Sequence, residues 1–92
     1  MTPLQERFRA VVADLAVGEV VSYREVARRA GQRGAARAVG GFLSAHGDDL
    51  PWWRVVRADG RLAAHKPREQ GRRLRAEGVE VVDDRIVDAL PR

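Results

Sequence analysis

The sequence predicts a mostly α-helical fold with a small β wing, the arrangement of a winged helix-turn-helix domain. Two segments carry helical start and stop signals, 22–31 and about 34–45, and the tight turn "GQRG" connects them. A hairpin signal, Asp59-Gly60 between apolar stretches, follows them. A chain of 92 residues, 45% hydrophobic and without repeats, has the size of one small globular unit. We therefore expect residues 1–92 to form a single domain.

The first helix has a complete start signal. Thr2 suits the N-cap, Pro3 suits the first helical position, and Gln5 completes a capping-box pattern. Apolar residues then recur at helical spacing, and Gly18 is predicted to end the helix.

The second helix is predicted to start at a further capping box, formed by Ser22 and Glu25, and to stop at Gly31. Tyr23 lies directly after the cap. Two roles are open for it: contact with a backbone phosphate of a nucleic acid, or half-buried packing.

The third helix has an unusual surface. Its inward positions are predicted to be Ala35, Ala38, Val39 and Phe42. Another face aligns Arg33, Arg37, Gly40, Gly41 and Ser44. Two glycines inside a helix cost about 1 kcal/mol each relative to Ala, which the close approach of another surface can offset. That surface is either the minor groove of DNA, with Arg37 inserted among the bases, or a neighbouring helix, with Arg37 solvated.

The predicted wing comprises a short strand over 54–57, the turn at Asp59-Gly60 and a return through Leu62. A last helix is expected from Pro67 to about Glu77, with Gly78 as its stop.

Two further features belong to this C-terminal part. We expect a solvated helix face that carries Arg68, Arg72 and Arg75. The stretch "VEVVDDRIV" predicts a second short hairpin with Asp83 and Asp84 in its turn.

Composition limits the function classes. The net charge is +4, and 16 of the 17 basic residues are Arg, which favours a nucleic-acid partner unless the bias reflects the genome. The absence of Cys excludes disulfides, thiolate metal sites and thiol nucleophiles. Two His are too few for a metal cluster without carboxylates, so no metal and no cofactor are expected. No apolar run reaches the roughly 20 residues of a membrane span, so we expect no membrane partner and a cytoplasmic location, nucleoid-associated in a bacterium.

The stretch "PWWRV" at 51–55 holds both Trp of the chain. In an extended segment Trp52 and Trp53 would point to opposite faces. The pair is therefore interpreted either as core or partner surface, or as an aromatic pocket in which an unstacked base is bound.

The motifs "SYREVA", "RAVGG", "PWWRVV" and "AEGVEV", in this order over about residues 3–82, resemble the C-terminal DNA-binding domain of the O-6-alkylguanine-DNA alkyltransferases. The resemblance implies that the "RAVGG" helix enters the minor groove and that the damaged base is flipped into a pocket. It assigns Arg37 as the finger that replaces the flipped base, and Tyr23 as the residue that turns the neighbouring phosphate.

One departure from that family decides the expected function. The alkyltransferases carry an acceptor Cys and an activating His where this chain has Trp52 and Trp53, and Trp cannot serve as a thiolate nucleophile. The chain therefore resembles the alkyltransferase-like proteins, which bind alkylated guanine without repairing it and pass the lesion to nucleotide excision repair. Many of them keep His after that Trp, so whether Trp53 lines the pocket or the core stays open.

The resemblance implies a non-enzymatic protein with two partners, DNA that contains alkylated guanine and nucleotide excision repair proteins. We expect this protein to be a monomer. The resemblance also implies a lesion pocket formed by Pro51, Trp52, Trp53, Arg54, Val55 and His65. Three alternatives remain: a winged-helix transcription regulator without lesion specificity, a protein–protein module with the Trp pair as hot spot, and an enzyme with another nucleophile.

Overall fold

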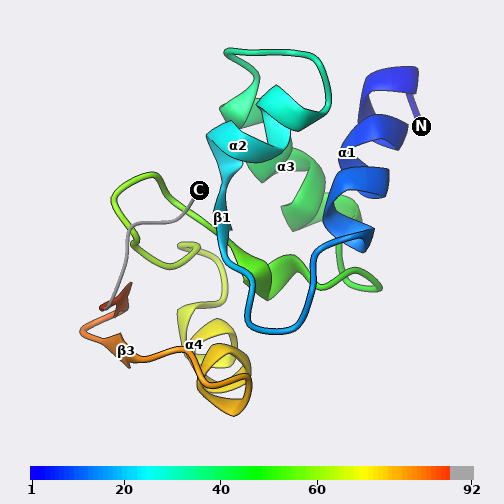
Figure 1. Cartoon of the computed structure of the whole chain (residues 1–92). Coiled ribbons are helices and arrows are strands. Elements are labelled where there is room, and N and C mark those ends of the chain that lie inside the picture. Colours follow the sequence, from blue (N-terminus) through cyan, green and yellow to red (C-terminus); the bar gives the residue numbers. More distant parts are fainter. Residues whose placement is uncertain (88–92) are drawn as a thin grey trace.

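The computed structural model describes residues 1–87 and confirms the mostly helical fold class. Figure 1 shows the helices between residues 3 and 46 gathered at one end of the molecule, and the helix over 67–76 with the C-terminal hairpin at the other. The helical elements are α1 (Pro3–Ala13), α2 (Tyr23–Arg29), α3 (Ala36–His46), the 3₁₀ helix η1 (Trp52–Arg54) and α4 (Pro67–Ala76). The strands are β1 (Val21–Ser22), β2 (Val55–Val56), β3 (Val81–Val82) and β4 (Arg85–Ile86).

Two apolar clusters form the core. The larger cluster lies among α1, α2 and α3 and includes Phe8, Val26, Val39, Phe42 and Trp52. The smaller cluster joins β2, α4 and the β3–β4 hairpin through Val56, Leu62, Leu74, Val81 and Ile86. Trp53 is half-buried and packs against both clusters, so it connects the two ends of the molecule.

The start of α1 matches the prediction. The Thr2 hydroxyl accepts a hydrogen bond from the Gln5 N–H, and the Gln5 side chain accepts one from the Thr2 N–H, which completes the capping box. The helix ends at Ala13, earlier than expected, and Gly18 serves the following connection with a φ of +81°.

The predicted capping box of α2 forms only in part. Ser22 accepts a hydrogen bond from the Glu25 N–H at 3.0 Å. The Glu25 carboxylate instead pairs with Arg28 and Arg29, at 2.6 and 2.8 Å. Because these two guanidinium groups bind it, the pKa of Glu25 is lowered to about 2.

The start predicted for α3, at about Gly34, is wrong. Gly34 has a φ of +85°, which interrupts the helical backbone, so α3 begins at Ala36. Arg33 therefore lies in the turn before α3 and not on its face. Ala38 is exposed, whereas Val39 and Phe42 are buried as predicted.

The wing also differs from the prediction. The strand is shorter and pairs in parallel with β1, Val21 opposite Val55, and not with the return segment. A turn is present: the Gly60 N–H donates to the Arg57 carbonyl at 2.9 Å. The return segment bonds to the second hairpin, since the Leu62 N–H donates to the Asp84 carbonyl. Across the first hairpin itself, the Arg57 N–H donates to the Arg61 carbonyl, but the described residues form no regular strand pair there.

The second hairpin and the last helix are confirmed. Strands β3 and β4 pair antiparallel around Asp83 and Asp84, whose φ values of 52° and 58° suit a tight two-residue turn. Pro67 is the first residue of α4, and Gly78 follows the helix with a φ of +87°. None of the helices in residues 1–87 is long and apolar enough to cross a bilayer.

Gly41 within α3 and Gly47 at its C-terminus provide a matched test of the packing. A Cβ on Gly47 would lie 2.6 Å from the Leu43 carbonyl oxygen and 2.9 Å from the Leu43 Cα, whereas a Cβ on Gly41 would have no atom within 4 Å. We expect Gly47→Ala to lower the free energy of unfolding by about 1–3 kcal/mol, because the backbone must shift. Gly41→Ala should raise it by up to about 1 kcal/mol. Urea unfolding followed by circular dichroism measures both, and equal effects would contradict this account of the helix end.

Candidate nucleic-acid interface

Helices α2 and α3 form the predicted helix-turn-helix and border an open hollow of about 800 Å³, here called the α3 hollow. The two helices supply one wall, and the segment after β2 with the loop before α4 supplies the other. The described residues that line it are Tyr23, Arg24, Ala36, Arg37, Gly40, Gly41, Arg57, Ala58, Ala64 and His65.

The glycines of α3 do not serve internal helix packing. A Cβ on Gly41 would meet open space, and a Cβ on Gly40 would only reach ordinary contact with the Tyr23 ring, at 3.9 Å. The interpretation that they permit a close helix–helix contact is therefore wrong. Without side chains at these two positions, the backbone of α3 is less covered there than a larger residue would leave it.

The α3 hollow is positively charged. Arg24, Arg37 and Arg57 line it, and no acidic residue is among the described residues of its lining. Arg37 is exposed, lies in the first turn of α3, and forms no hydrogen bond or ion pair with any of residues 1–87. Its guanidinium is therefore free to bind a ligand.

Other arginines also have unpaired side chains. Within residues 1–87, the arginine side chains without a hydrogen bond, ion pair or ring contact are Arg24, Arg33, Arg37, Arg57, Arg68, Arg72 and Arg85. Arg33, predicted for the α3 face, lines a separate hollow of about 330 Å³ beside α2, here called the α2 hollow. Arg24 lines both hollows, so they adjoin.

Tyr23 combines the two roles that the sequence left open. Its ring is half-buried against the larger apolar cluster, and it also lines the α3 hollow. Burial raises the pKa of the Tyr23 hydroxyl, while the nearby positive charge of Arg57 acts in the opposite direction. The phenol stays neutral at physiological pH and can donate a hydrogen bond into the hollow.

The Trp pair does not adopt the extended backbone that would point the rings to opposite faces. Both residues lie in η1, and their rings meet edge to face with centroids 6.1 Å apart. Trp52 is only 5% exposed and belongs to the larger cluster. Its ring contacts His65, with centroids 5.6 Å apart, and Lys66 Nζ lies 5.5 Å from its centroid. His65 thus contacts Trp52 and also lines the α3 hollow.

Trp53 is fixed by a partly buried polar cluster. Its indole Nε1 donates to Glu77 Oε2 at 2.7 Å, and the Arg73 guanidinium lies 4.5 Å from its ring centroid. Glu77 also pairs with Arg54 at 2.8 Å and accepts from the Gly18 N–H at 2.8 Å. The Arg54 guanidinium is the main reason that the pKa of Glu77 falls to about 2.

The residues assigned to the lesion pocket are therefore divided by the structure. His65 lines the α3 hollow, whereas the segment from Pro51 to Val55 is not among the described lining residues of that hollow. Arg54 and Val55 are buried, and Arg54 donates to the Leu15 carbonyl as well as to Glu77. Ser44 is exposed on α3, and it too is not among the described lining residues.

Sequence reasoning missed two arginines of the α3 hollow, Arg24 and Arg57, and also the role of Glu77. Arg57 was assigned only to the wing strand. The signal available for Arg24 was its place next to Tyr23 at the N-terminus of the helix that precedes the basic face. For Glu77, the sequence indicated only a helix end, because its partners lie 23 or more residues away.

Over residues 3–79 the chain matches the family model for the DNA-binding domain of 6-O-methylguanine DNA methyltransferase. The chain belongs to this family. The resemblance found in its motifs is thereby confirmed, and the α3 hollow lies on the helix-turn-helix of a DNA-binding domain.

Curated relatives and solved structures agree with this assignment. A DNA base-flipping protein of Vibrio parahaemolyticus is 40% identical over 77 residues, which cover 78% of this chain and 76% of the relative. A protein of the same description from Escherichia coli is 40% identical over 87 residues, or 90% and 67% of the two chains. The crystal structure of S. pombe Atl1 with damaged DNA containing O6-carboxymethylguanine matches with a TM-score of 0.81 at 30% identity, covering 89% of this chain and 82% of that chain. A crystal structure of S. pombe ATL in complex with DNA matches with a TM-score of 0.81 at 27% identity, covering 98% of this chain and 92% of that chain.

The Glu77 cluster predicts an acid-dependent stability. The Arg54 and Glu77 side chains are each 11% exposed, so Glu77→Gln should lower the free energy of unfolding at pH 7 by about 3 kcal/mol. A carboxylate whose pKa is lowered from 4.5 to about 2 stabilises the fold above pH 4.5, and this contribution is lost as the pH falls towards 2. The difference in free energy of unfolding between the unchanged protein and the Glu77→Gln variant should therefore decrease as the pH falls from 4.5 to 2.

Urea unfolding at a series of pH values measures this difference. The matched control is Glu80→Gln, at an exposed position, which should change the free energy of unfolding by less than about 0.5 kcal/mol. If the loss of unfolding free energy caused by Glu77→Gln stays constant from pH 7 to pH 2, the ionised carboxylate is not its source.

Proposed function

We propose that the protein is a non-enzymatic sensor of O-6-alkylguanine in double-stranded DNA. It binds through the minor groove, flips the alkylated base out of the helix and marks the site for nucleotide excision repair. The observation that carries the proposal is the outer surface of α3, where Gly40 and Gly41 leave the backbone accessible beside the unpaired Arg37. The DNA base-flipping proteins and the Atl1 complex with damaged DNA among its relatives support it.

The surface supplies what base flipping requires. Extruding a base costs a few kcal/mol, and least where its pairing is already weakened, as O-6 alkylation weakens that of guanine. Arg37 at the start of α3 is long enough to enter the vacated stack, while the glycines about one turn later let the helix sit deep in the groove. Tyr23 stands beside Gly40, where its hydroxyl can bind the phosphate next to the flipped nucleotide.

We propose that the flipped base enters the α3 hollow beside His65, with Trp52 as the wall behind it. Trp52 occupies the position that the resemblance gives to the alkyl-accepting Cys, and its indole offers no nucleophile. The chain contains no Cys that could replace it. The protein consequently binds the lesion without changing it, so that nucleotide excision repair proteins must remove it. The protein acts where DNA is kept, in the cytoplasm or nucleoid.

Fluorescence anisotropy with two matched duplexes tests the function. One carries guanine and the other O-6-methylguanine at the same position. We expect about tenfold tighter binding to the lesion, equivalent to about 1.4 kcal/mol. Radiolabelled alkyl groups on the DNA should not be transferred to the protein. Equal binding to both duplexes would reject lesion recognition, and sequence-specific binding would favour a transcription regulator.

Arg37→Ala tests the finger assignment. Because Arg37 fills the vacated stack, its loss should remove most of the tenfold preference for the lesion and leave weak binding to both duplexes. The matched control is Arg68→Ala, which also removes an exposed and unpaired guanidinium, but from α4. The same anisotropy titration should show the full preference with this control. An Arg37→Ala protein with unchanged preference would refute the assignment.

A further inference from the structure

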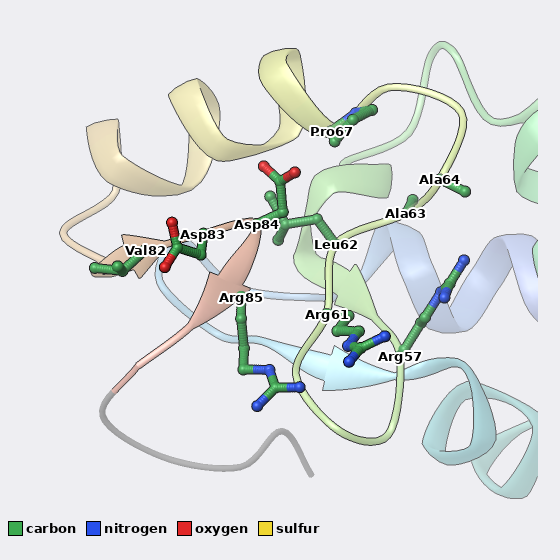
Figure 2. Close-up of a pocket in the computed structure, with 10 residues that line it drawn as sticks. All are labelled: Arg57, Arg61, Leu62, Ala63, Ala64, Pro67, Val82, Asp83, Asp84 and Arg85. Atoms are coloured by element: carbon green, nitrogen blue, oxygen red, sulfur yellow. The ribbon is translucent and has the colours of Figure 1, made fainter.

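A second large hollow lies outside the helix-turn-helix. It has a volume of about 550 Å³ and is enclosed by the segment from Arg57 to Pro67 and by the β3–β4 hairpin (Figure 2). We call it the hairpin hollow. Figure 2 shows Arg57, Arg61 and Arg85 in a row along one side, with Asp83 and Asp84 across from them.

The guanidinium groups of this row are available to a ligand. The side chains of Arg57 and Arg85 form no hydrogen bond or ion pair with the described residues 1–87. Arg61 pairs only with Asp59, at 3.4 Å, and both side chains are more than half exposed. An ion pair this exposed contributes little to stability, so a phosphate can readily displace Asp59 from Arg61.

The backbone fixes the spacing of the row. The Arg57 N–H donates to the Arg61 carbonyl at 2.9 Å, which closes the turn. The Ile86 N–H donates to the Gly60 carbonyl at 3.0 Å, and Arg61 and Arg85 form a β-bridge. The three arginines therefore stand on a frame that is ordered before any ligand arrives, which reduces the entropic cost of binding.

The hairpin hollow continues the α3 hollow. Arg57 and Ala64 line both. A strand of DNA held against α3 would therefore pass directly from one hollow into the other, and the first groups that it meets are guanidinium groups. The planar guanidinium is the side chain best matched to the two oxygens of a phosphodiester.

We propose that the hairpin hollow is a second DNA-binding site, in which Arg61 and Arg85 bind backbone phosphates that flank the flipped nucleotide. This inference rests on the proposed function, since it assumes that DNA lies on α3. Asp83 and Asp84 repel the backbone from the opposite side of the hollow and so keep it on the arginine row. Phosphate contacts of this kind add affinity for any sequence and do not recognise the lesion.

The salt dependence of binding tests the site. Each phosphate that a protein neutralises adds about 0.9 to the steepness with which log K falls against log salt concentration. We expect Arg85→Gln to reduce the steepness by about this amount and to weaken binding to the guanine and the O-6-methylguanine duplex by the same factor. The control Arg72→Gln, which replaces an exposed and unpaired arginine of α4, should leave the slope unchanged.

A double variant, Asp83→Asn with Asp84→Asn, gives an independent measurement. Asn tolerates the left-handed backbone of both positions, so the turn is kept. Removing two negative charges beside the DNA backbone should tighten binding to both duplexes. Unchanged binding with this variant, or an Arg85→Gln slope equal to that of the unchanged protein, would overturn the second site.

The two proposals fail in different ways. If the unchanged protein prefers the lesion but Arg85→Gln leaves the salt slope unaltered, the second site is rejected and lesion recognition stands. If the protein binds both duplexes equally and Arg85→Gln still makes the slope shallower, the hairpin hollow binds DNA phosphates and lesion recognition is rejected.

Discussion

The ion pair between Arg54 and Glu77 is the constraint on which the rest of the molecule depends. A small chain buries few apolar residues, and Trp53 packs against both of its apolar clusters. Glu77, at the end of α4, binds Arg54 and Trp53 of η1 and the Gly18 amide of the α1–β1 connection. One carboxylate thus ties three separate segments together. A buried ion pair is stabilising only when its remaining groups are satisfied, and here the Arg54 Nη1 also reaches the Leu15 carbonyl.

The allocation of arginines follows from this organisation. Some arginines are paired: Arg54 with Glu77 between segments, and Arg28 and Arg29 with Glu25 on the surface of α2. Most of those left unpaired within residues 1–87 line one of the three hollows. Arg33 lies in the α2 hollow, and Arg85 in the hairpin hollow, while Arg24 and Arg57 lie where hollows adjoin. This concentration of unpaired guanidinium groups along adjoining hollows favours a functional origin for at least part of the arginine excess.

Much of the fold could be predicted because its signals are local. The capping box at Thr2, the stop at Gly78 and the turn at Asp83 and Asp84 each depend on a few neighbouring residues. The errors came from contacts between distant segments. The partner of the wing strand is β1, about 34 residues earlier, and Gln70 fixes the wing loop by binding the Ala63 N–H and the Val55 carbonyl. For the same reason the sequence indicated Arg37, Tyr23 and the glycines of the candidate site, but not how Trp52 and Trp53 divide between hollow and core.

The position of the Trp pair links the site to the fold. Trp52 reaches the α3 hollow only through His65, whereas Trp53 spans the two clusters and binds Glu77. The α2–α3 wall of the α3 hollow belongs to the end of the molecule built on the larger cluster, and the hairpin hollow lies at the end built on the smaller one. The contacts of Trp53 therefore link the two ends of the molecule, and Arg57 and Ala64 join the two surfaces that we propose to hold one DNA strand. A side chain at the position of a reactive His, by the resemblance, acts here through its packing: Trp53 contacts both apolar clusters and so helps to hold the two ends of the molecule in a fixed arrangement.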